Sequence, residues 1–424
     1  MGKNLLRGAV AVAAAAALAV PVAGVANAAL IDPDPNWNIQ PVAGPGVYRI
    51  ADKDRIATAI EASQTRDDWG FKSTRLVWKC DDTTRPLHNN PAQGSWVAGN
   101  TVQVPTASVG GLSTCTATVV NNWSVRHILV ARADDYSDAL AATTLADVTN
   151  APVLLNPTAE LDPRNRAEIA RLAAGQNWTS VSLLGGTNAL SHTVENAINA
   201  IPGVNVTFRH QGIDRYETAV EISKISILFF GGILANDEVN VYLTTGVDFA
   251  DALAAGTSAA QNDGVVLLTK GDELDRRGFT ENFLIDLQDL VIDEAPFVSF
   301  NTSEIFAVGG PAVRAARTYD IRVADEYLGA DRYETAVLAA RGTFGNPKHF
   351  AVTSGLNYPD AVVASSYIAN ADGPLLLSKP NTLTPVTAGY LADKVENGDS
   401  VITFGGTDTL TNAVTNQIAE LFNY

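Results

Sequence analysis

Gly212-Ile213-Asp214-Arg215-Tyr216-Glu217-Thr218-Ala219-Val220 is the stretch that decides the fold, because the chain repeats it as Gly329-Ala330-Asp331-Arg332-Tyr333-Glu334-Thr335-Ala336-Val337. A shorter copy, Asp54-Arg55-Ile56-Ala57-Thr58-Ala59, lies near the N-terminus. We call this stretch the first motif. Recurrence of one stretch along a chain indicates repeated structural units, so we expect a fold built from copies of one domain.

Two further motifs recur in the same order and mark three copies of the repeat. The second motif is an aromatic residue followed two positions later by Asp and a run of small or aliphatic residues. The third motif is a pair of glycines directly after an apolar run. The second motif occupies 136–142, 249–255 and 358–364, and the third ends at Gly186, Gly310 and Gly406.

Apolar runs alternate with helical segments between these motifs. In the second copy the runs are 239–245 and 264–269, and 151–155 and 373–377 match the latter run in the other copies. Continuous apolar runs separated by helices are what a parallel sheet covered on both faces requires. The sequence therefore predicts that each repeat is a small, doubly wound α/β domain.

The first copy is interrupted, because nearly seventy residues separate Ala59 from the apolar run at 127–131. Short alternating runs broken by Gly, Pro and Asn predict a small β-rich insertion over about 62–123. The insertion contains both cysteines of the chain, Cys80 and Cys115, which in an exported protein predict a disulfide. Two free thiols are the alternative.

Four of the six tryptophans also lie in the insertion. Their flat apolar faces suit stacking on sugar rings, but a small β module also needs a few tryptophans for its own core. We favour the core interpretation. The four are Trp69, Trp78, Trp96 and Trp123.

The first 28 residues have the pattern of a secretory signal peptide. Lys3 and Arg7 precede an apolar run over 9–20, and Ala26-Asn27-Ala28 is a typical cleavage site. No later segment reaches the ~18 consecutive apolar residues that a membrane span needs. We therefore expect a soluble, exported protein.

The mature chain is strongly acidic. Without the leader, 27 basic residues face 46 acidic ones, a net charge of −19. Such a surface repels nucleic acid and anionic lipid, so we expect neither as a partner.

The first motif has a structural explanation that leaves its arginine unassigned. Asp214 and Asp331 stand three residues before a glutamate, which is the spacing of a helix capping box. The arginines Arg215, Arg332 and, in the first copy, Arg55 remain available for a carboxylate or an anionic ligand group.

The second motif has Asp138, Asp251 and Asp360 where a strand passes into a helix. This end of an open α/β sheet is the usual place for ligands, and helix N-terminal amides there can hold an anion. Asp is also an ordinary N-cap residue. We favour the N-cap interpretation over ligand contact.

Nothing in the sequence predicts catalysis, a cofactor or a metal site. No Gly-x-Ser-x-Gly or His-Glu-x-x-His pattern occurs, and the glycine pairs lack the residues of a nucleotide-binding loop. We expect the pairs to form tight strand-to-helix turns. The five histidines, all outside the motifs, are His88, His127, His192, His210 and His349.

The three motifs, in this order, resemble the cell wall binding repeat type 2 family, which occurs in tandem threes on secreted proteins of Gram-positive bacteria. The resemblance covers roughly 47–60 and 124–424. It implies three Rossmann-like or Toprim-like α/β units in a pseudo-threefold arrangement, with no catalysis in the repeats. The expected divisions are a signal peptide (1–28), an N-terminal linker (29–46) and repeats at 47–206, 207–322 and 323–424.

The resemblance also implies noncovalent attachment to the cell wall through secondary wall polymers, often anionic, in grooves between repeats. Because the net charge opposes broad attraction to an anionic polymer, binding would rely on local arginines or on bridging divalent cations, and a neutral polysaccharide is an alternative ligand. The expected ligand-binding residues are Arg55, Arg215, Arg332, Asp138, Asp251 and Asp360. The alternative function is a surface-layer or adhesion protein whose insertion binds a protein or glycan.

Overall fold

The structure, a computed structural model, describes residues 46–80, 84–86, 101–105, 112–230, 238–275, 277–287, 290–291 and 299–421. The expected signal peptide and the linker up to residue 45 lie outside this range. Among the described helices, none has the length and apolar character that crossing a membrane requires.

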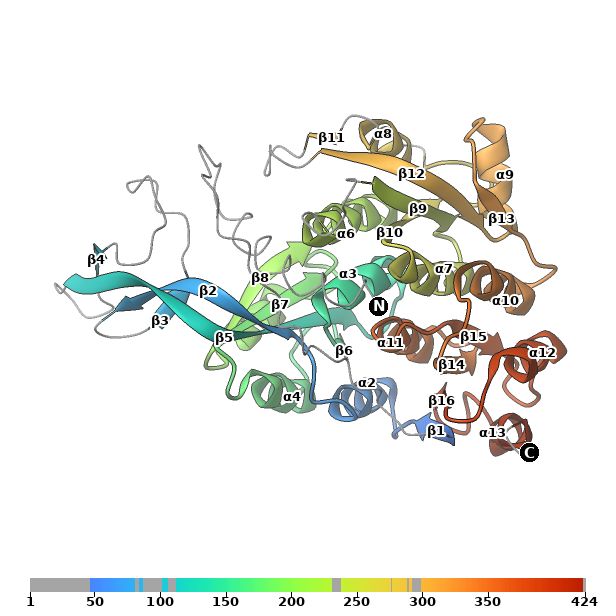
Figure 1. The fold of residues 1–424 in the computed structure, drawn as a ribbon, viewed down its shortest axis with the longest axis horizontal. Helices are drawn as coiled ribbons and strands as arrows, with labels where there is room; N and C mark the ends of the chain where they lie inside the picture. Colours follow the sequence, from blue (N-terminus) through green and yellow to red (C-terminus); the bar gives the residue numbers. More distant parts are fainter. Residues whose placement is uncertain are drawn as a thin grey trace.

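Three sheets, one per repeat, form the framework, and each contains four parallel strands (Figure 1). We number the strands of a repeat by the motifs: the first strand precedes the second motif, the second strand follows it, and the third strand precedes the third motif. In each sheet the first strand is central, with the second strand on one side and the third on the other. The first sheet has the spatial order β6 (Val153–Asn156), β5 (Leu112–Arg132), β7 (Trp178–Leu184) and β8 (Val204–His210). The second has β10 (Gly264–Thr269), β9 (Glu238–Thr245), β12 (Ser299–Val308) and β13 (Asp325–Tyr327), with β11 (Leu290–Val291) antiparallel to β12. The third has β15 (Leu375–Ser378), β14 (His349–Ser354), β16 (Ser400–Phe404) and β1 (Gly46–Ile50).

The predicted apolar runs are these strands. All six residues of β10 are buried, as are all four residues of β6 and β15. Strands buried on both faces need apolar side chains at every position, and this explains why the runs are continuous. The predicted α/β class with parallel sheets is confirmed.

The helices of the first motif pack against the sheet of the same repeat, and those of the second motif meet in the centre. The first set is α2 (Arg55–Gln64), α6 (Arg215–Phe230) and α10 (Arg332–Thr343). The second set is α3 (Ala142–Thr149), preceded by the short 3-10 turn η1 (Ser137–Ala139), α7 (Ala250–Gln261) and α11 (Tyr358–Ala369). The outer helices are α4 (Pro163–Ala173), α5 (His192–Asn199), α8 (Phe279–Asp286), α9 (Gly310–Thr318), α12 (Pro385–Lys394) and α13 (Asn412–Glu420).

The central helices α3, α7 and α11 each contact both of the others. Directly after the second motif, five residues beyond its Asp, the three copies have Thr143, Gly256 and Ser365. Thr143 Oγ1 donates to Ser365 Oγ at 3.0 Å, and a β-carbon on Gly256 would lie 2.8 Å from Thr143. Small residues at this position therefore allow three helices to converge. The pseudo-threefold relation between the repeats stays a prediction.

The N-terminal strand completes the sheet of the last repeat. β1 pairs in parallel with β16, with Tyr48 opposite Ile402, although some 350 residues separate them. β8 and β13 likewise complete the sheet of another repeat. Each directly precedes a copy of the first motif but pairs in the sheet of the repeat before it. Each of the three expected repeats thus begins with all or part of a strand that pairs in the sheet of another repeat. The three repeats are therefore interlocked.

The insertion extends the first sheet beyond the helices. β2 (Phe71–Cys80) and β4 (Thr101–Pro105) pair antiparallel with the N-terminal part of β5, and β3 (Thr84–Pro86) pairs with β2. Figure 1 shows this β structure projecting from the body of the molecule. The backbone register has Cys80 directly opposite Cys115. Their side chains lie outside the described residues, so the disulfide stays a prediction.

Candidate functional site

The arginines of the first motif reach the aromatic residues of the second motif across the junctions between repeats. Arg55 of the first repeat lies over the ring of Tyr358 of the third, 5.6 Å from the ring centroid. The same contact joins Arg215 to Tyr136 at 5.5 Å and Arg332 to Phe249 at 5.7 Å. Each arginine therefore bridges its own repeat and the preceding one in a cyclic order.

The three aromatic residues also contact one another. Tyr136 lies 5.3 Å from Tyr358 and 5.9 Å from Phe249, and the Phe249–Tyr358 distance is 6.3 Å, all between ring centroids. We call these three residues the aromatic triad. Ring pairs at such distances with inclined planes are favourable. The triad and its arginines therefore hold the three repeats together at one end of the central helices.

Each arginine also donates to the loop that follows the first strand of its own repeat. Arg55 Nη1 donates to the Ala133 carbonyl at 2.6 Å. Arg215 Nη1 donates to Gly246 O at 2.7 Å, and Arg332 Nη1 to Gly355 O at 2.6 Å. The arginines thus already have a structural role, while Arg55 remains exposed and the other two half-buried.

The three junctions differ in their polar contacts. Tyr136 Oη donates to Val247 O at 2.8 Å, and Tyr358 Oη donates to Ala133 O at 3.2 Å. Phe249 lacks a hydroxyl, and at its junction Arg332 Nη2 instead pairs with Asp248 at 2.6 Å. In the described part of the chain, Arg55 and Arg215 form no ion pair.

The predicted helix caps of the first motif are confirmed. Asp214 Oδ1 accepts from the amides of Tyr216 and Glu217, and Asp331 and Asp54 cap their helices in the same way. Glu217 Oε2 accepts from the amide of Ile213, the residue before the cap. The shorter first copy of the motif retains the Asp cap but has no glutamate that could add this second hydrogen bond.

The N-cap interpretation of the second-motif aspartates is wrong. α7 and α11 begin at Ala250 and Tyr358, so Asp251 and Asp360 lie inside the first turn, and Asp138 lies within η1. The helices begin earlier because the residues before these aspartates, such as Pro359 at the second position of α11, are compatible with a first helical turn.

The aspartates instead pack against the third motif. A β-carbon on Gly185 would lie 2.4 Å from Asp138 Oδ2, and the corresponding distances are 2.1 Å for Gly309 to Asp251 and 2.6 Å for Gly405 to Asp360. These glycines have φ of +99°, +87° and +102°, which only glycine adopts readily. The predicted tight strand-to-helix turn is confirmed in the second copy, where α9 begins at Gly310, whereas seven residues separate β7 from α5 and β16 from α13.

This contact lies at the carboxyl ends of the first and third strands of each repeat. These two strands are neighbours in each sheet, and the chain continues from one of them toward one edge of the sheet and from the other toward the opposite edge. Such a place is called a topological switch point, and open α/β sheets usually bind ligands there. Here an aspartate side chain occupies each switch point.

Burial raises the pKa of all three aspartates, but the second copy differs. A hydrogen bond from Thr218 opposes the rise for Asp138, and one from Thr409, at 2.8 Å, does so for Asp360. Burial, with a smaller contribution from nearby Asp248, raises the pKa of Asp251 to about 6. Asp251 Oδ1 is buried without a hydrogen-bond partner.

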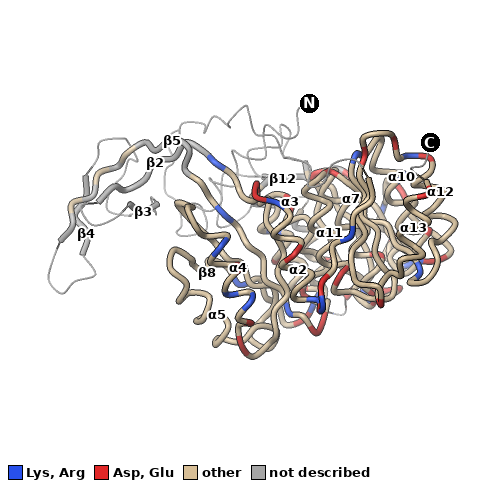
Figure 2. Tube along the Cα trace, turned by 90° about the horizontal axis from the view of Figure 1, so that it is seen from below, with Lys and Arg blue, Asp and Glu red and all other residues tan. Residues whose placement is uncertain are grey.

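Exposed apolar side chains next to the junction arginines were not predicted from the sequence. Val247 and Leu356, at equivalent positions before the second-motif helices, are 60% and 64% exposed, and Ile213 beside Arg215 is 65% exposed. Val247 and Leu356 both follow the glycine that comes directly after the first strand of their repeat, and this repeated position was a sequence signal that could have identified them. Over the rest of the body acidic and basic residues are interspersed (Figure 2).

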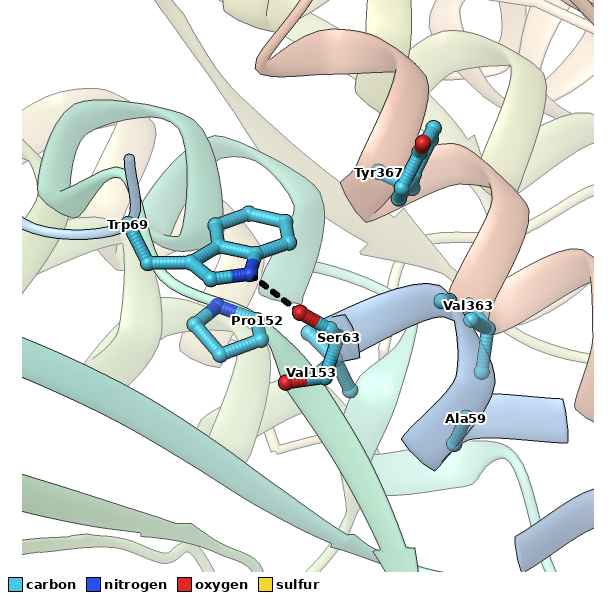
Figure 3. Close-up of a pocket in the computed structure, with 8 residues that line it drawn as sticks. Ala59, Ser63, Trp69, Pro152, Val153, Val363 and Tyr367 are labelled. Atoms are coloured by element: carbon cyan, nitrogen blue, oxygen red, sulfur yellow. Dashed lines mark hydrogen bonds between the residues drawn. The ribbon is translucent and has the colours of Figure 1, made fainter. Parts of the chain in front are cut away.

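Trp69 of the insertion is buried in the core of the repeats, whereas the core interpretation had placed the tryptophans in a core of the insertion itself. Its side chain is buried and its Nε1 donates to Ser63 O at 2.8 Å (Figure 3). It lines, with Tyr367 of α11, a cavity of about 10 Å³ between the first and third repeats, which has room for about one water molecule. This cavity is a packing gap, too small for a ligand. The other three insertion tryptophans have side chains outside the described residues.

Comparison with known proteins gives three findings. The sequence family described as Cell wall binding domain 2 (CWB2) matches residues 49–195, 209–318 and 327–415. The amidase enhancer of Bacillus subtilis (strain 168) is 24% identical over 329 residues, which are 77% of this chain and 42% of that protein. N-acetylmuramoyl-L-alanine amidase LytC of the same organism is 27% identical over 217 residues, 50% of this chain and 39% of that protein.

The chain thus spans about two fifths of the length of these curated relatives. Among solved structures, Cwp6 from Clostridium difficile superposes with a TM-score of 0.63 over 90% of this chain and 48% of that chain, at 18% identity. Similarity at this identity concerns the fold.

Proposed function

The chain belongs to the Cell wall binding domain 2 family, and from this membership we propose that it is an exported protein that attaches noncovalently to secondary polymers or polysaccharide of a Gram-positive cell wall. The family match covers all three repeats, and it carries the assignment to cell-wall binding. The polymer-binding role of particular residues is our proposal.

The observation that supports a site at the repeat junctions is the cyclic set of arginine contacts. Arg55, Arg215 and Arg332 come from different repeats yet occupy equivalent junctions, each beside the aromatic triad. Arg55 and Arg215 form no ion pair within the described residues, so their charges are available to an anionic or hydroxyl-rich polymer. An extended polymer with a regular repeat suits equivalent sites that act together.

The proposed polymer contact combines local positive charge with exposed apolar side chains. Because the whole chain has a formal net charge of −17, long-range attraction to an anionic polymer is unfavourable and the contact must form at short range. Ile213, Val247 and Leu356 offer apolar surface to the pyranose rings of a polysaccharide beside these arginines. Asp138, Asp251 and Asp360 contribute by shaping the loops behind the site.

The proposal is a binding role without catalysis in the repeats. Among the residues that the structure describes, no group of three or more His, Cys, Asp or Glu side chains is arranged to hold a metal ion. The amidase activity named for one relative belongs to that protein.

Sedimentation with purified cell walls tests this proposal. We expect the mature chain (29–424) to pellet with untreated walls and to stay in the supernatant once secondary polymers are chemically removed. Replacement of Arg55, Arg215 and Arg332 by alanine together should weaken binding at least tenfold. If the wild-type chain stays in the supernatant with untreated walls, the proposal fails.

Arg314→Ala and Arg341→Ala provide the matched control. Both arginines are surface residues that pair with a carboxylate, Asp272 and Asp393, away from the junctions. Their removal changes the net charge in the same direction without touching the aromatic triad. Equal loss of binding in the control would show that bulk charge, and not the junction site, governs attachment.

A second candidate function is adhesion through the insertion. β5 continues without a break from the core sheet into the projecting β structure, so a ligand contact there would be rigidly connected to the anchor. Deletion of 74–122, with a short Gly-Ser linker in its place, leaves α2, Trp69 and the core part of β5 intact and separates the two functions. Wall sedimentation should survive the deletion if the repeats are the anchor, and binding to a protein or glycan partner should disappear if the insertion is the adhesive element.

A further inference from the structure

Arg126 is a buried arginine at the root of the insertion. It lies on β5 where pairing with β2 gives way to pairing with β7, since Val125 is opposite Phe71 and Arg126 is opposite Thr179. The residue is 7% exposed, and its Nε and Nη1 are buried without a hydrogen-bond partner. No carboxylate in the described part of the chain forms an ion pair with it.

Two further arginines lie close to Arg126, and each already has a carboxylate. Arg66, just after α2, donates from Nε and Nη2 to Asp68 at 2.8 and 3.1 Å, yet its buried Nη1 has no partner. Arg171 on α4 donates from Nη2 and Nε to Glu168 at 2.7 and 2.8 Å. Figure 2 shows basic residues at the base of the projecting β structure and around α4.

The charges around Arg126 do not compensate it. Burial, with a contribution from the neighbouring Arg171, lowers the pKa of Arg126 to about 10, although Asp68 and Asp67 act in the opposite direction. Asp67 has a side chain that is 96% exposed, so water screens its charge. A buried cation with a like charge among its neighbours and no hydrogen bonds is expensive, by several kcal/mol in typical proteins.

We propose that Arg126, Arg66 and Arg171 form an oxyanion-binding site at the root of the insertion, and that its ligand is a phosphate group. Buried nitrogens without a partner, on Arg126 (Nε and Nη1) and on Arg66 (Nη1), are the observation behind this proposal, and such a ligand would satisfy one side of the Arg126 guanidinium together with Arg66 Nη1. A phosphate group fits better than a carboxylate because Asp68 and Glu168 already supply Arg66 and Arg171 with carboxylates, and a tetrahedral anion has several oxygens for three donors to share.

This site is separate from the repeat junctions, and it stands whether or not the proposed wall attachment is correct. Arg126 follows the last insertion residue, 123, by three positions, and Arg66 is near its first, so the ligand would connect the two ends of the insertion. Bound phosphate would thereby fix the projecting β structure relative to the first repeat.

Calorimetric titration of the mature chain with inorganic phosphate tests the site, at constant ionic strength held with chloride. We expect one phosphate per chain and a rise in the unfolding temperature with phosphate. Arg126→Met should lower phosphate affinity at least tenfold and abolish that rise, and Arg126→Lys, which keeps the charge but has fewer donors, should have intermediate affinity. A parallel titration with glycerol 1-phosphate separates a phosphate ester from the free ion as the natural ligand.

Arg209→Met is the matched control. Arg209 is also a mostly buried strand arginine with an unpartnered Nε, but it pairs with Glu195 and donates to two carbonyls in another part of the first sheet. This variant should lose stability yet keep wild-type phosphate affinity. The proposal is overturned if the wild-type chain binds no phosphate, or if phosphate raises the unfolding temperature of the Arg126→Met variant as much as that of the wild type.

Discussion

The carboxylate of Asp360 occupies the space that a side chain on Gly405 would need. A β-carbon on Gly405 would lie 2.6 Å from Asp360 Oδ2, and the glycine has φ of +102°. The same contact joins Asp138 to Gly185 and Asp251 to Gly309. Two motifs that are 45 residues or more apart in the sequence are therefore the two halves of one packing contact.

Gly405→Ala should destabilise the protein through this contact. Gly398 is the matched control, since its φ is +107° but nothing lies within 4 Å of the position of its β-carbon. We expect Gly398→Ala to cost about 1 kcal/mol for the backbone conformation alone, and Gly405→Ala about 2 kcal/mol more because the buried Asp360 cannot move away. Equal losses in urea unfolding would contradict the contact.

Gly256→Val should disrupt the convergence of the central helices. Its β-carbon would meet Thr143 at 2.8 Å, whereas Gly389, on the outer helix α12, has nothing within 4 Å. We predict that Gly256→Val costs at least 2 kcal/mol by overpacking and that Gly389→Val changes the free energy of unfolding by less than about 0.5 kcal/mol. Thermal unfolding of both variants measures the difference, and similar unfolding temperatures would count against the helix contact.

Asp251→Asn should change how stability depends on pH. Because burial raises the pKa of Asp251 from its ordinary value of 3.8 to about 6, the folded protein holds this proton more tightly than the unfolded chain does. The contribution of Asp251 is therefore fully present below about pH 4 and is lost as the pH rises through 6, by up to about 3 kcal/mol. Relative to wild type, Asp251→Asn should gain stability over this interval.

Asp272→Asn is the control for the sign of that effect. Its hydrogen bonds with Arg314 hold the pKa of this surface carboxyl below its usual range, so its contribution is lost as the pH falls. In unfolding curves between pH 2.5 and 7.5, the difference from wild type should change between about pH 4 and 6 for Asp251→Asn, and only below about pH 4, with the opposite sign, for Asp272→Asn. A flat difference between wild type and Asp251→Asn would mean that Asp251 is ionised without cost.

Removal of β1 should destabilise the third repeat. A mature chain that begins at residue 52 loses the β1–β16 pairing, the buried side chain of Ile50 and the bonds from Arg49 to Gly405 O and Thr415 Oγ1. We expect a loss of about 5 kcal/mol from apolar burial and hydrogen bonds. A chain that begins at residue 46 should unfold like the full mature chain; if the shorter chain does so too, the third sheet is stable without its fourth strand.

Local pattern was sufficient for much of the fold. The apolar runs at 239–245 and 264–269 predicted buried parallel strands, and the spacing of Asp214 and Glu217 predicted a capped helix, because both features depend on neighbours within a few residues. The aspartates of the second motif were interpreted wrongly as N-caps, since the helix start depends on the whole loop and the same residue type suits several positions in a first turn.

The sequence by itself determined the repeat, its α/β class and the residues that gather at the junctions. It did so because each copy has the same pattern of apolar runs, glycines and helix caps. Only the tertiary structure decided which copies meet. Segments far apart in the chain place Arg55 over Tyr358 and let β1 complete the sheet of β16. They also bury two donor atoms of Arg126 without a hydrogen-bond partner. Such contacts arise from the packing of three repeats around the central helices. The residue pattern within one repeat therefore cannot predict them.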